Sequence, residues 1–273
     1  DCPSFSFESP AIKPGDWLVQ IIVSVMQRYK CTVEYDGRPY HGWQYQDEVI
    51  SVQQVFEAAI EKFAGTFVRV YVSGRTDAGV HALGQVVHFD LPKYYPAEAV
   101  MNAINHHLKP DPVAIKECEE VTEDFHARFS SKKRYYMYRI INRRAPLTFE
   151  AGLAWGIYKP LDIDAMNEAA QHLIGTFDFT TFRATECQAK SPIKTLEKLE
   201  IKRSAENPLE IRVFTESRSF LHHQVRNMVG TLVLVGKGSW KPIDVKSALE
   251  AKDRRAGGPT APADGLYFVK VDY

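Results

Sequence analysis

An arginine and an aspartate lie two positions apart in a glycine-rich stretch, Ser73-Gly74-Arg75-Thr76-Asp77-Ala78-Gly79-Val80-His81-Ala82-Leu83. The runs on either side, 67–72 and 85–89, have strand-like composition, so the stretch predicts a loop longer than a tight hairpin needs. A carboxylate on a loop held by two strands can act as a nucleophile, a general base or a metal ligand. The spacing of Arg75 and Asp77 alone does not choose among these roles.

Charge is balanced over the whole chain but uneven along it. The 273 residues contain 34 Lys and Arg against 34 Asp and Glu, so no global positive field indicates a nucleic-acid partner. Basic residues gather locally at 132–134, 143–144, 202–203 and 254–255, and an acidic run occupies 117–124. Each basic cluster is by itself either a solvated surface or a set of phosphate contacts.

Cysteine usage and hydropathy limit where the protein works. The four cysteines, at positions 2, 31, 118 and 187, are far apart and form no CxxC pair. This pattern argues against a disulfide framework or a zinc ribbon and predicts a cytoplasmic protein. The apolar run Trp17–Val25 is too short to span a bilayer, so no membrane segment is predicted. We expect residues 1–25 to be a leader outside the fold, because the strand pattern begins after Met26.

The remaining chain is long enough for two compact units, and its pattern divides it into two halves, 26–125 and 126–273. In the first half we expect a strand from 29, a helix from 51 to 65, strands at 67–72 and 85–89, a helix from 96 to 110 and a strand at 113–115. The first helix is opened by an S-x-x-Q capping box at Ser51. This β-α-β-β-α-β order is that of ferredoxin-like domains.

The second half repeats the order less cleanly. We expect strands at 134–142, 194–203, 209–217 and 266–271, and helices at 162–173, 221–235 and from about 242. The segments 143–161 and 174–192 are predicted to be loops. The fold class is therefore α+β, with two ferredoxin-like halves and mainly antiparallel sheets. Two such sheets would leave a cleft between them, where we expect the active site.

Further motifs are spread in order over the chain. They are Glu34–Gly37 with Tyr40–Gln44, GRTDAGVHALGQVVHF from Gly74, Phe125–Ser130 with Arg134–Tyr138, Phe179–Ala184, Phe220–Gly230 and Gly265–Phe268. Together they resemble the TruA-type tRNA pseudouridine synthases over nearly everything from Arg28 onward. The resemblance implies an isomerase that converts uridine to pseudouridine in the anticodon arm of tRNA, at tRNA positions 38, 39 and 40. It also implies a homodimer that needs no metal and no organic cofactor.

The resemblance assigns roles to single residues. Asp77 matches the catalytic aspartate, and Arg226 matches the buried arginine that keeps such a carboxylate ionised. Tyr136 matches the active-site tyrosine, which would stack on the target uracil and help to remove the C5 proton. Arg75 would fill the gap left by a flipped-out uridine, or alternatively contact only phosphate.

Other polar residues are expected in the same cleft, and two other functions stay open. We expect Arg183, His81 and His222 to bind substrate. A zinc site is not expected, because His222 and His223 are adjacent and would face different directions on a helix. The first alternative function is a non-catalytic RNA-binding protein of the same fold. The second is a hydrolase whose carboxylate nucleophile would release free uracil.

Overall fold

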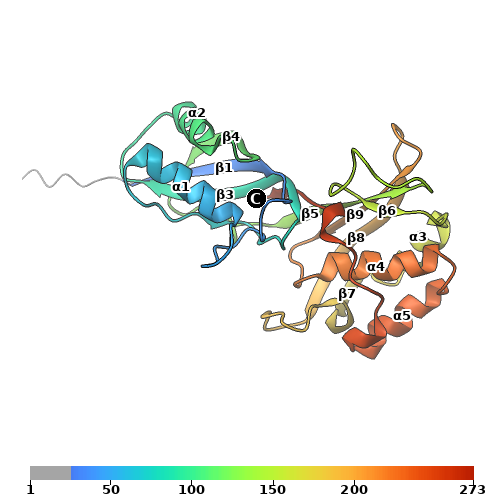
Figure 1. Ribbon diagram of the computed structural model, residues 1–273. Helices are drawn as coiled ribbons and strands as arrows, with labels where there is room; N and C mark the ends of the chain where they lie inside the picture. Colours follow the sequence, from blue (N-terminus) through green and yellow to red (C-terminus); the bar gives the residue numbers. More distant parts are fainter. Residues whose placement is uncertain (1–25) are drawn as a thin grey trace, which may run out of the picture.

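A single ten-stranded sheet runs through the part of the chain that the computed structural model describes, residues 26–273 (Figure 1). Its main strand order is β4-β1-β3-β10-β5-β9-β8-β7, with β2 paired to β3 and β6 paired to β5. The leader expected at 1–25 lies outside the described residues. Within 26–273, no helix has the length and apolarity that crossing a membrane would require.

The N-terminal half has the predicted order of elements. They are β1 (Gln27–Tyr35), α1 (Val52–Ala64), β2 (Tyr71–Val72), β3 (His81–Leu91), α2 (Ala97–Leu108) and β4 (Val113–Val121). Helix α1 begins at the predicted capping box, where the Gln54 N–H donates to the Ser51 hydroxyl at 3.2 Å. It ends at Gly65, whose φ of 71° is in the left-handed region that favours glycine.

The strand before the Asp77 loop is shorter than predicted. Only Tyr71–Val72 pairs with β3, whereas residues 67–70 lie outside the sheet. The reason is that the Val70 N–H donates to the Glu57 carboxylate of α1 at 3.0 Å instead of to a neighbouring strand. The loop itself is also shorter than predicted, because β3 already begins at His81.

The C-terminal half contains two strands that the sequence did not reveal. Its elements are β5 (Lys133–Asn142), β6 (Trp155–Ile157), α3 (Ile163–Gln171), β7 (Gly175–Asp178), β8 (Ile193–Arg203), β9 (Glu210–Ser217), α4 (Gln224–Gly236), α5 (Pro242–Ala251) and β10 (Leu266–Asp272). The unexpected strands, β6 and β7, have three and four residues, which is too short for alternation to be recognised. Figure 1 shows α3, α4 and α5 gathered on this half.

The expectation of two separate sheets is wrong. β10 lies between β3 and β5, parallel to β3 and antiparallel to β5, and so joins the two halves into one mixed sheet. A second parallel pairing links β5 and β6. Leu266, Tyr267 and Phe268 are consecutive and all buried, as in a strand covered on both faces. A run of this kind indicates a central strand but does not say which strands will flank it.

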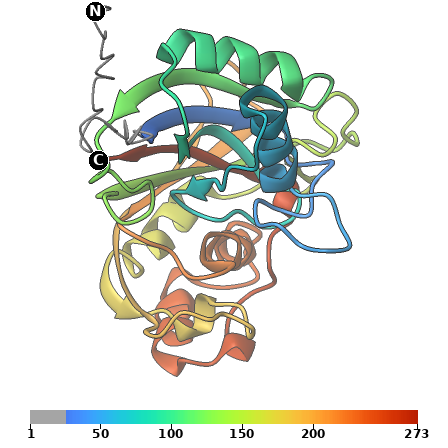
Figure 2. The same cartoon turned by 90° about the vertical axis from the view of Figure 1, so that its left-hand side faces the viewer.

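The core of the N-terminal half lies between its helices and one face of the sheet. In β1, Tyr29, Cys31 and Val33 are fully buried and alternate with the less buried Lys30 and Thr32. The buried side chains pack with apolar residues of the two helices, among them Phe56, Ile60, Val100 and Ile104. Figure 2, in which this half faces the viewer, shows α1 and α2 beside the strands. β3, which follows the Asp77 loop and pairs with β1, is therefore anchored in this core.

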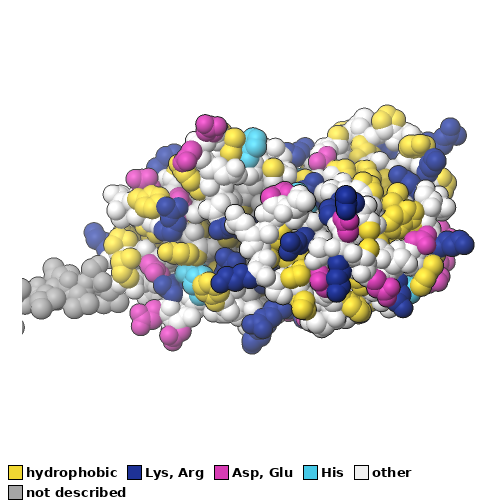
Figure 3. Space-filling model, turned by 90° about the horizontal axis from the view of Figure 1, so that it is seen from below, with side chains coloured by type: hydrophobic (Ala, Val, Ile, Leu, Met, Phe, Trp, Pro, Cys, Tyr) yellow, Lys and Arg dark blue, Asp and Glu magenta, His cyan; other side chains and the backbone are white. Residues whose placement is uncertain are grey.

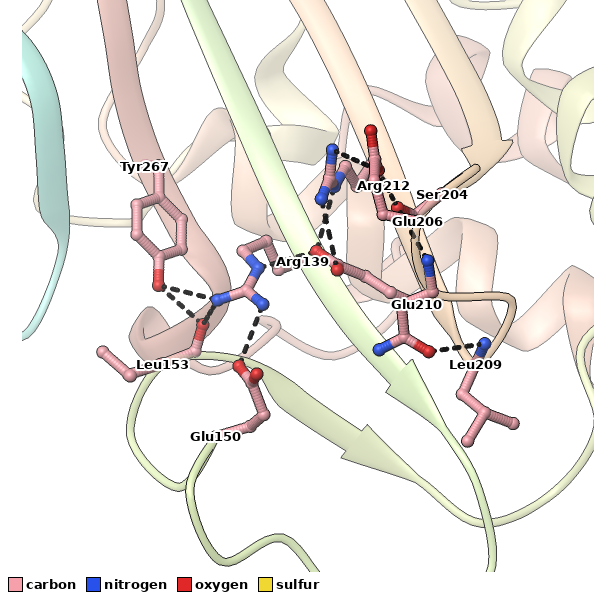
Figure 4. Close-up of polar contacts among 10 residues, drawn as sticks. Arg139, Glu150, Leu153, Ser204, Glu206, Leu209, Glu210, Arg212 and Tyr267 are labelled. Carbon is pink, nitrogen blue, oxygen red and sulfur yellow. Dashed lines mark hydrogen bonds and ion pairs between the residues drawn. The ribbon is translucent and has the colours of Figure 1, made fainter.

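A polar network ties the strands of the C-terminal half together (Figure 4). Arg139 on β5 donates to Glu210 on β9 at 2.7 Å and to Glu150 of the following loop at 2.9 Å. The Glu210 side chain is only 4% exposed and also pairs with Arg212 at 3.0 Å. Burial raises the pKa of Glu210, but the hydrogen bonds from Arg212 and Arg139 outweigh it and lower that pKa. A buried carboxylate is thus matched by two guanidinium groups.

Candidate active site

Asp77 lies on the loop between β2 and β3, and three side chains surround its carboxylate. Oδ2 accepts a hydrogen bond from Arg226 Nη1 at 3.1 Å. His222 Nε2 lies 3.2 Å from Oδ1, and His223 Nε2 lies 3.4 Å from Oδ2. The Asp77 side chain keeps 20% of its surface exposed. The carboxylate is therefore held in place and still accessible to a ligand.

Arg226 is fixed on α4 by the segment that precedes β10. Its Nε donates to the Ala261 carbonyl at 2.8 Å, and the Ala261 N–H donates to the Arg226 carbonyl at 3.1 Å. A Cβ at Gly230 would lie only 1.8 Å from the Pro259 carbonyl oxygen, so only glycine allows this segment so close to the helix. With Nε occupied in this way, Nη1 is directed to Asp77.

The prediction that His222 and His223 face different directions is wrong. Neither residue lies within α4: His223 is its N-cap, with φ 61° and ψ 3°, and this left-handed conformation brings both rings to Asp77. Their ring centroids are 4.1 Å apart. One ligand atom from each of Asp77, His222 and His223 lies within 4.8 Å of the others, so the three residues could hold a metal ion. The guanidinium of Arg226 on the same carboxylate opposes a second cation there.

The surroundings of Asp77 favour its ionised form. Burial raises the pKa of the Asp77 carboxyl, but the hydrogen bond with His222 and the charges of His223, His222 and Arg226 outweigh it and lower that pKa. The same hydrogen bond raises the pKa of His222, whereas burial lowers the pKa of His223. At neutral pH the site therefore presents a carboxylate anion.

Tyr136 on β5 is 9% exposed and lies between two phenylalanines. Its ring meets Phe220 edge to face at 5.1 Å and Phe268 at 5.0 Å. Burial raises the pKa of Tyr136, and the nearby Asp77 charge adds to this effect. The neighbouring Tyr135 instead donates its hydroxyl to Asp272 at 2.5 Å. Because adjacent strand residues face opposite ways, Tyr136 and not Tyr135 lies on the side of Asp77.

Two predicted substrate-binding arginines belong to segments next to the site. Arg75 is exposed on the catalytic loop and makes no side-chain hydrogen bond or ion pair with any residue of 26–273. Arg183 is half-buried, and the next residue, Ala184, donates its N–H to the His222 carbonyl at 2.9 Å. That backbone contact brings the segment 179–184 to the rim of the site.

His81 lies apart from these residues. Its ring is 2% exposed and stacks on Tyr267 with centroids 4.7 Å apart. Nδ1 accepts the Gly37 N–H at 3.1 Å, and Nε2 lies 3.0 Å from the Gly152 carbonyl oxygen. Burial lowers the pKa of His81 and so favours the neutral ring that these two contacts require. With both nitrogens occupied, His81 is better described as a structural residue than as a substrate ligand.

Comparison with known proteins adds to this geometry. A family model described as tRNA pseudouridine synthase matches residues 32–130 and 169–273. The chain is 57% identical over 248 residues to tRNA pseudouridine synthase A of Paramagnetospirillum magneticum, covering 91% of this chain and 96% of the relative. The proteins of the same name from Rhodospirillum rubrum and Caulobacter vibrioides are each 56% identical. Both matches cover 91% of this chain, with 88% and 99% of the respective relatives.

Proposed function

The chain belongs to the tRNA pseudouridine synthase family, and on that premise we propose that it isomerises uridine to pseudouridine in tRNA. One observation supports this most strongly: an accessible loop carboxylate, Asp77, accepts a hydrogen bond from Arg226 and is kept ionised by the hydrogen bond with His222 and the charges of His223, His222 and Arg226. Carboxylates of this kind attack electrophilic carbons in sugar chemistry. The site therefore has the group that the reaction needs first.

The reaction is balanced without any additional reactant. The bond between the ribose C1′ and uracil N1 breaks, and a bond between C1′ and C5 forms. A proton leaves C5 and N1 ends protonated, so no carbon skeleton is oxidised or reduced overall. We propose that Asp77 attacks the ribose C1′ or the uracil C6 to begin this exchange. No organic cofactor or metal is needed for these steps.

Tyr136 provides a ring and a hydroxyl beside the carboxylate. We propose that the ring stacks on the target uracil while the hydroxyl lies near C5. Because burial raises its pKa, the hydroxyl is protonated in the resting enzyme. It would therefore relay the C5 proton to a second acceptor, and Asp77 can serve as that acceptor once its bond to the substrate has broken.

The target positions, the oligomeric state and the subdivision of the fold are proposed from the resemblance to the TruA-type family and from the order of helices and strands. We propose that the target uridines are those at tRNA positions 38, 39 and 40, and that the enzyme acts as a cytoplasmic homodimer. We also propose that each half is a ferredoxin-like unit, which the order β1-α1-β2-β3-α2-β4 supports for the first half. Arg75, exposed two residues from Asp77, is suited to fill the space of a flipped base.

Release of tritium from tRNA labelled at uridine C5 tests the proposal. Isomerisation expels that hydrogen, so we expect release without free uracil. A non-catalytic RNA-binding protein would bind the same tRNA and release no tritium. A hydrolase would liberate uracil, which chromatography of the products would reveal. The contact between Asp77 and Arg226 favours the isomerase over the non-catalytic alternative.

A further inference from the structure

A buried arginine without a carboxylate partner lies next to the catalytic loop. Arg134 on β5 is 9% exposed, and no ion pair joins it to any part of 26–273. Its guanidinium donates instead to three backbone carbonyls, those of Ser73 at 2.5 Å, Arg128 at 3.3 Å and Arg218. Burial lowers the pKa of Arg134. Three segments that are far apart in sequence are thus gathered around one side chain.

Each gathered segment carries an exposed arginine. They are Arg75, two residues after Ser73, and Arg128 and Arg218 themselves. None of the three forms an ion pair with a described residue, whereas elsewhere Arg28 pairs with Asp90 at 2.7 Å. Arg128 and Arg218 both lie beside Arg134, because their backbone carbonyls accept hydrogen bonds from its guanidinium. Unneutralised guanidinium groups beside an RNA-modifying site are suited to phosphate.

An exposed aromatic ring stands in the same place. Phe129 is 73% exposed, and the Arg128 guanidinium carbon lies 5.8 Å from its ring centroid. His126 holds the turn rigid, because its Nδ1 accepts the N–H groups of Arg128 at 3.1 Å and Phe129 at 3.4 Å. The His126 ring supports Phe129 with centroids 4.3 Å apart. Phe129 is therefore a fixed platform in water rather than a loose side chain.

The aromatic row continues toward the catalytic loop. The His126 ring meets His88 at 4.6 Å, and His88 stacks on Tyr71 at 5.0 Å with an angle of 18°. Tyr71 is 47% exposed and belongs to β2, which leads directly into the loop. Single-stranded RNA is recognised by this combination of exposed rings and guanidinium groups.

We propose that Phe129, Arg128 and Arg218 form a second nucleotide site, which holds an unpaired nucleotide of the RNA next to the flipped uridine. The base stacks on Phe129, and its flanking phosphates pair with Arg128 and Arg218. Arg134 is a positioning residue that fixes this site to the start of the catalytic loop through the Ser73 carbonyl. This second site rests on the proposed function. It would make the isomerase prefer uridines in an RNA loop, where a neighbouring nucleotide is unpaired.

The first test compares two exposed phenylalanines. Phe129→Ala should raise the Kd for an unmodified tRNA transcript roughly tenfold, as expected for loss of one stacked base. Phe149→Ala is the matched control, since Phe149 is 96% exposed on the loop after β5 and should bind tRNA as the wild type does. Both variants should keep the wild-type melting temperature. Phe129→Tyr, which keeps an aromatic ring, should bind tRNA with the wild-type affinity. A Kd for Phe129→Ala within twofold of the Phe149→Ala value would overturn the proposal.

The second test uses salt and a fluorescent base. Arg128→Ala and Arg218→Ala should each lower the slope of log Kd against log salt by about one, whereas Phe129→Ala should leave it unchanged. 2-Aminopurine placed in the anticodon loop should be quenched by the wild type and not by Phe129→Ala. If Phe129→Ala instead changes only the mass in solution, the surface is an interface between copies and the proposal fails.

Tritium release by the wild type keeps the two claims separate. If the wild type releases tritium and the Phe129 variants bind tRNA with the wild-type Kd, the proposed second site is refuted and the isomerase assignment stands. If the wild type releases none, the isomerase assignment fails, and the Kd series still decides whether Phe129 contacts RNA.

Discussion

The guanidinium of Arg226 donates to the Asp77 carboxylate at 3.1 Å, and the two residues are 149 positions apart in the chain. Asp77 comes from a loop of the N-terminal half, whereas Arg226 belongs to α4 of the C-terminal half. The ionised carboxylate therefore depends on both halves being joined in one sheet. Any change that shifts one half against the other is expected to affect the charge state of Asp77 before it affects the fold.

We predict that Asp77→Asn lowers isomerisation by more than about a thousandfold. The amide is nearly isosteric and can still accept from Arg226, but it cannot act as a nucleophile. Tritium release and tRNA affinity should be measured together, because the affinity should be largely kept. Asp124→Asn, on an exposed turn after β4, is the control and should turn over normally. Turnover of Asp77→Asn within tenfold of wild type would rule out the proposed nucleophile.

We predict that Arg226→Ala lowers both activity and stability. It leaves the Asp77 charge unpaired, and since both side chains keep 15–20% exposure we expect a loss of about 2 kcal/mol. Urea unfolding should be measured for Arg226→Ala in the wild-type and in the Asp77→Asn background. The loss of unfolding free energy should be smaller in the Asp77→Asn background, because no carboxylate charge is left there without its partner. Equal costs in both backgrounds would show that packing, not charge, is what Arg226 contributes.

We predict that His222 stabilises the fold mainly at acid pH. The hydrogen bond with Asp77 raises the pKa of His222 above its ordinary value of 6.5. Its contribution is therefore fully present below that value and is lost as the pH rises through the folded-state pKa. His222→Asn should therefore destabilise the protein more at about pH 5.5 than at about pH 8.5.

The matched control for that experiment is His41→Asn, an exposed histidine outside every helix and strand and in no ion pair within the described chain. Its effect on urea unfolding should be the same at both pH values. A His222→Asn difference that is flat with pH, or larger at the alkaline value, would contradict the charged contact with Asp77.

We predict that tRNA affinity falls steeply with salt although the chain has no net charge. The basic residues of one face are scattered among acidic ones (Figure 3). Several basic side chains of residues 26–273 are already paired with carboxylates. Lys202, for example, pairs with Glu200 at 2.7 Å, whereas Arg75 has no carboxylate partner among residues 26–273. Arg75→Ala should therefore lower the salt slope by about one, and Lys202→Ala should leave it unchanged. Equal slopes for the two variants would refute this distinction.

Phosphate contacts are therefore expected at basic side chains without a carboxylate partner, rather than at every basic cluster of the sequence. In the cluster 132–134, Arg134 is buried against carbonyl groups, and Lys133 pairs with Glu197 at 2.6 Å. Clustering in sequence does not show whether a charge is already balanced by a neighbouring strand. The unpaired arginines Arg128 and Arg218 are isolated in the sequence and carry no signal of this kind.

The sequence predicted those elements whose signals lie within the element itself. The capping box at Ser51 gave the start of α1, because the hydrogen bond lies within one turn. β6 and β7 were missed because strands of three and four residues owe their form to a neighbour rather than to their own pattern. The place of β10 between β3 and β5 was missed for the same reason.

The residues of the active site were also predicted only in part. The contact between Asp77 and Arg226 was expected and is present. The approach of His223 was missed, because a left-handed conformation at a histidine leaves no mark in the sequence. His81 was expected to bind substrate in the cleft, but as the first residue of β3 its side chain is directed into the protein.

The position of β10 has a consequence for how the protein is made. β10 is the last described strand to leave the ribosome, and it fills the middle of the sheet. Until then β3 and β5 lack their shared neighbour, and Tyr136 lacks the ring of Phe268 on which it rests. A nascent chain arrested before Leu266 should therefore be cut readily by protease, because its open strand edges are not yet covered. A prematurely terminated fragment is therefore expected to be degraded rather than to bind tRNA.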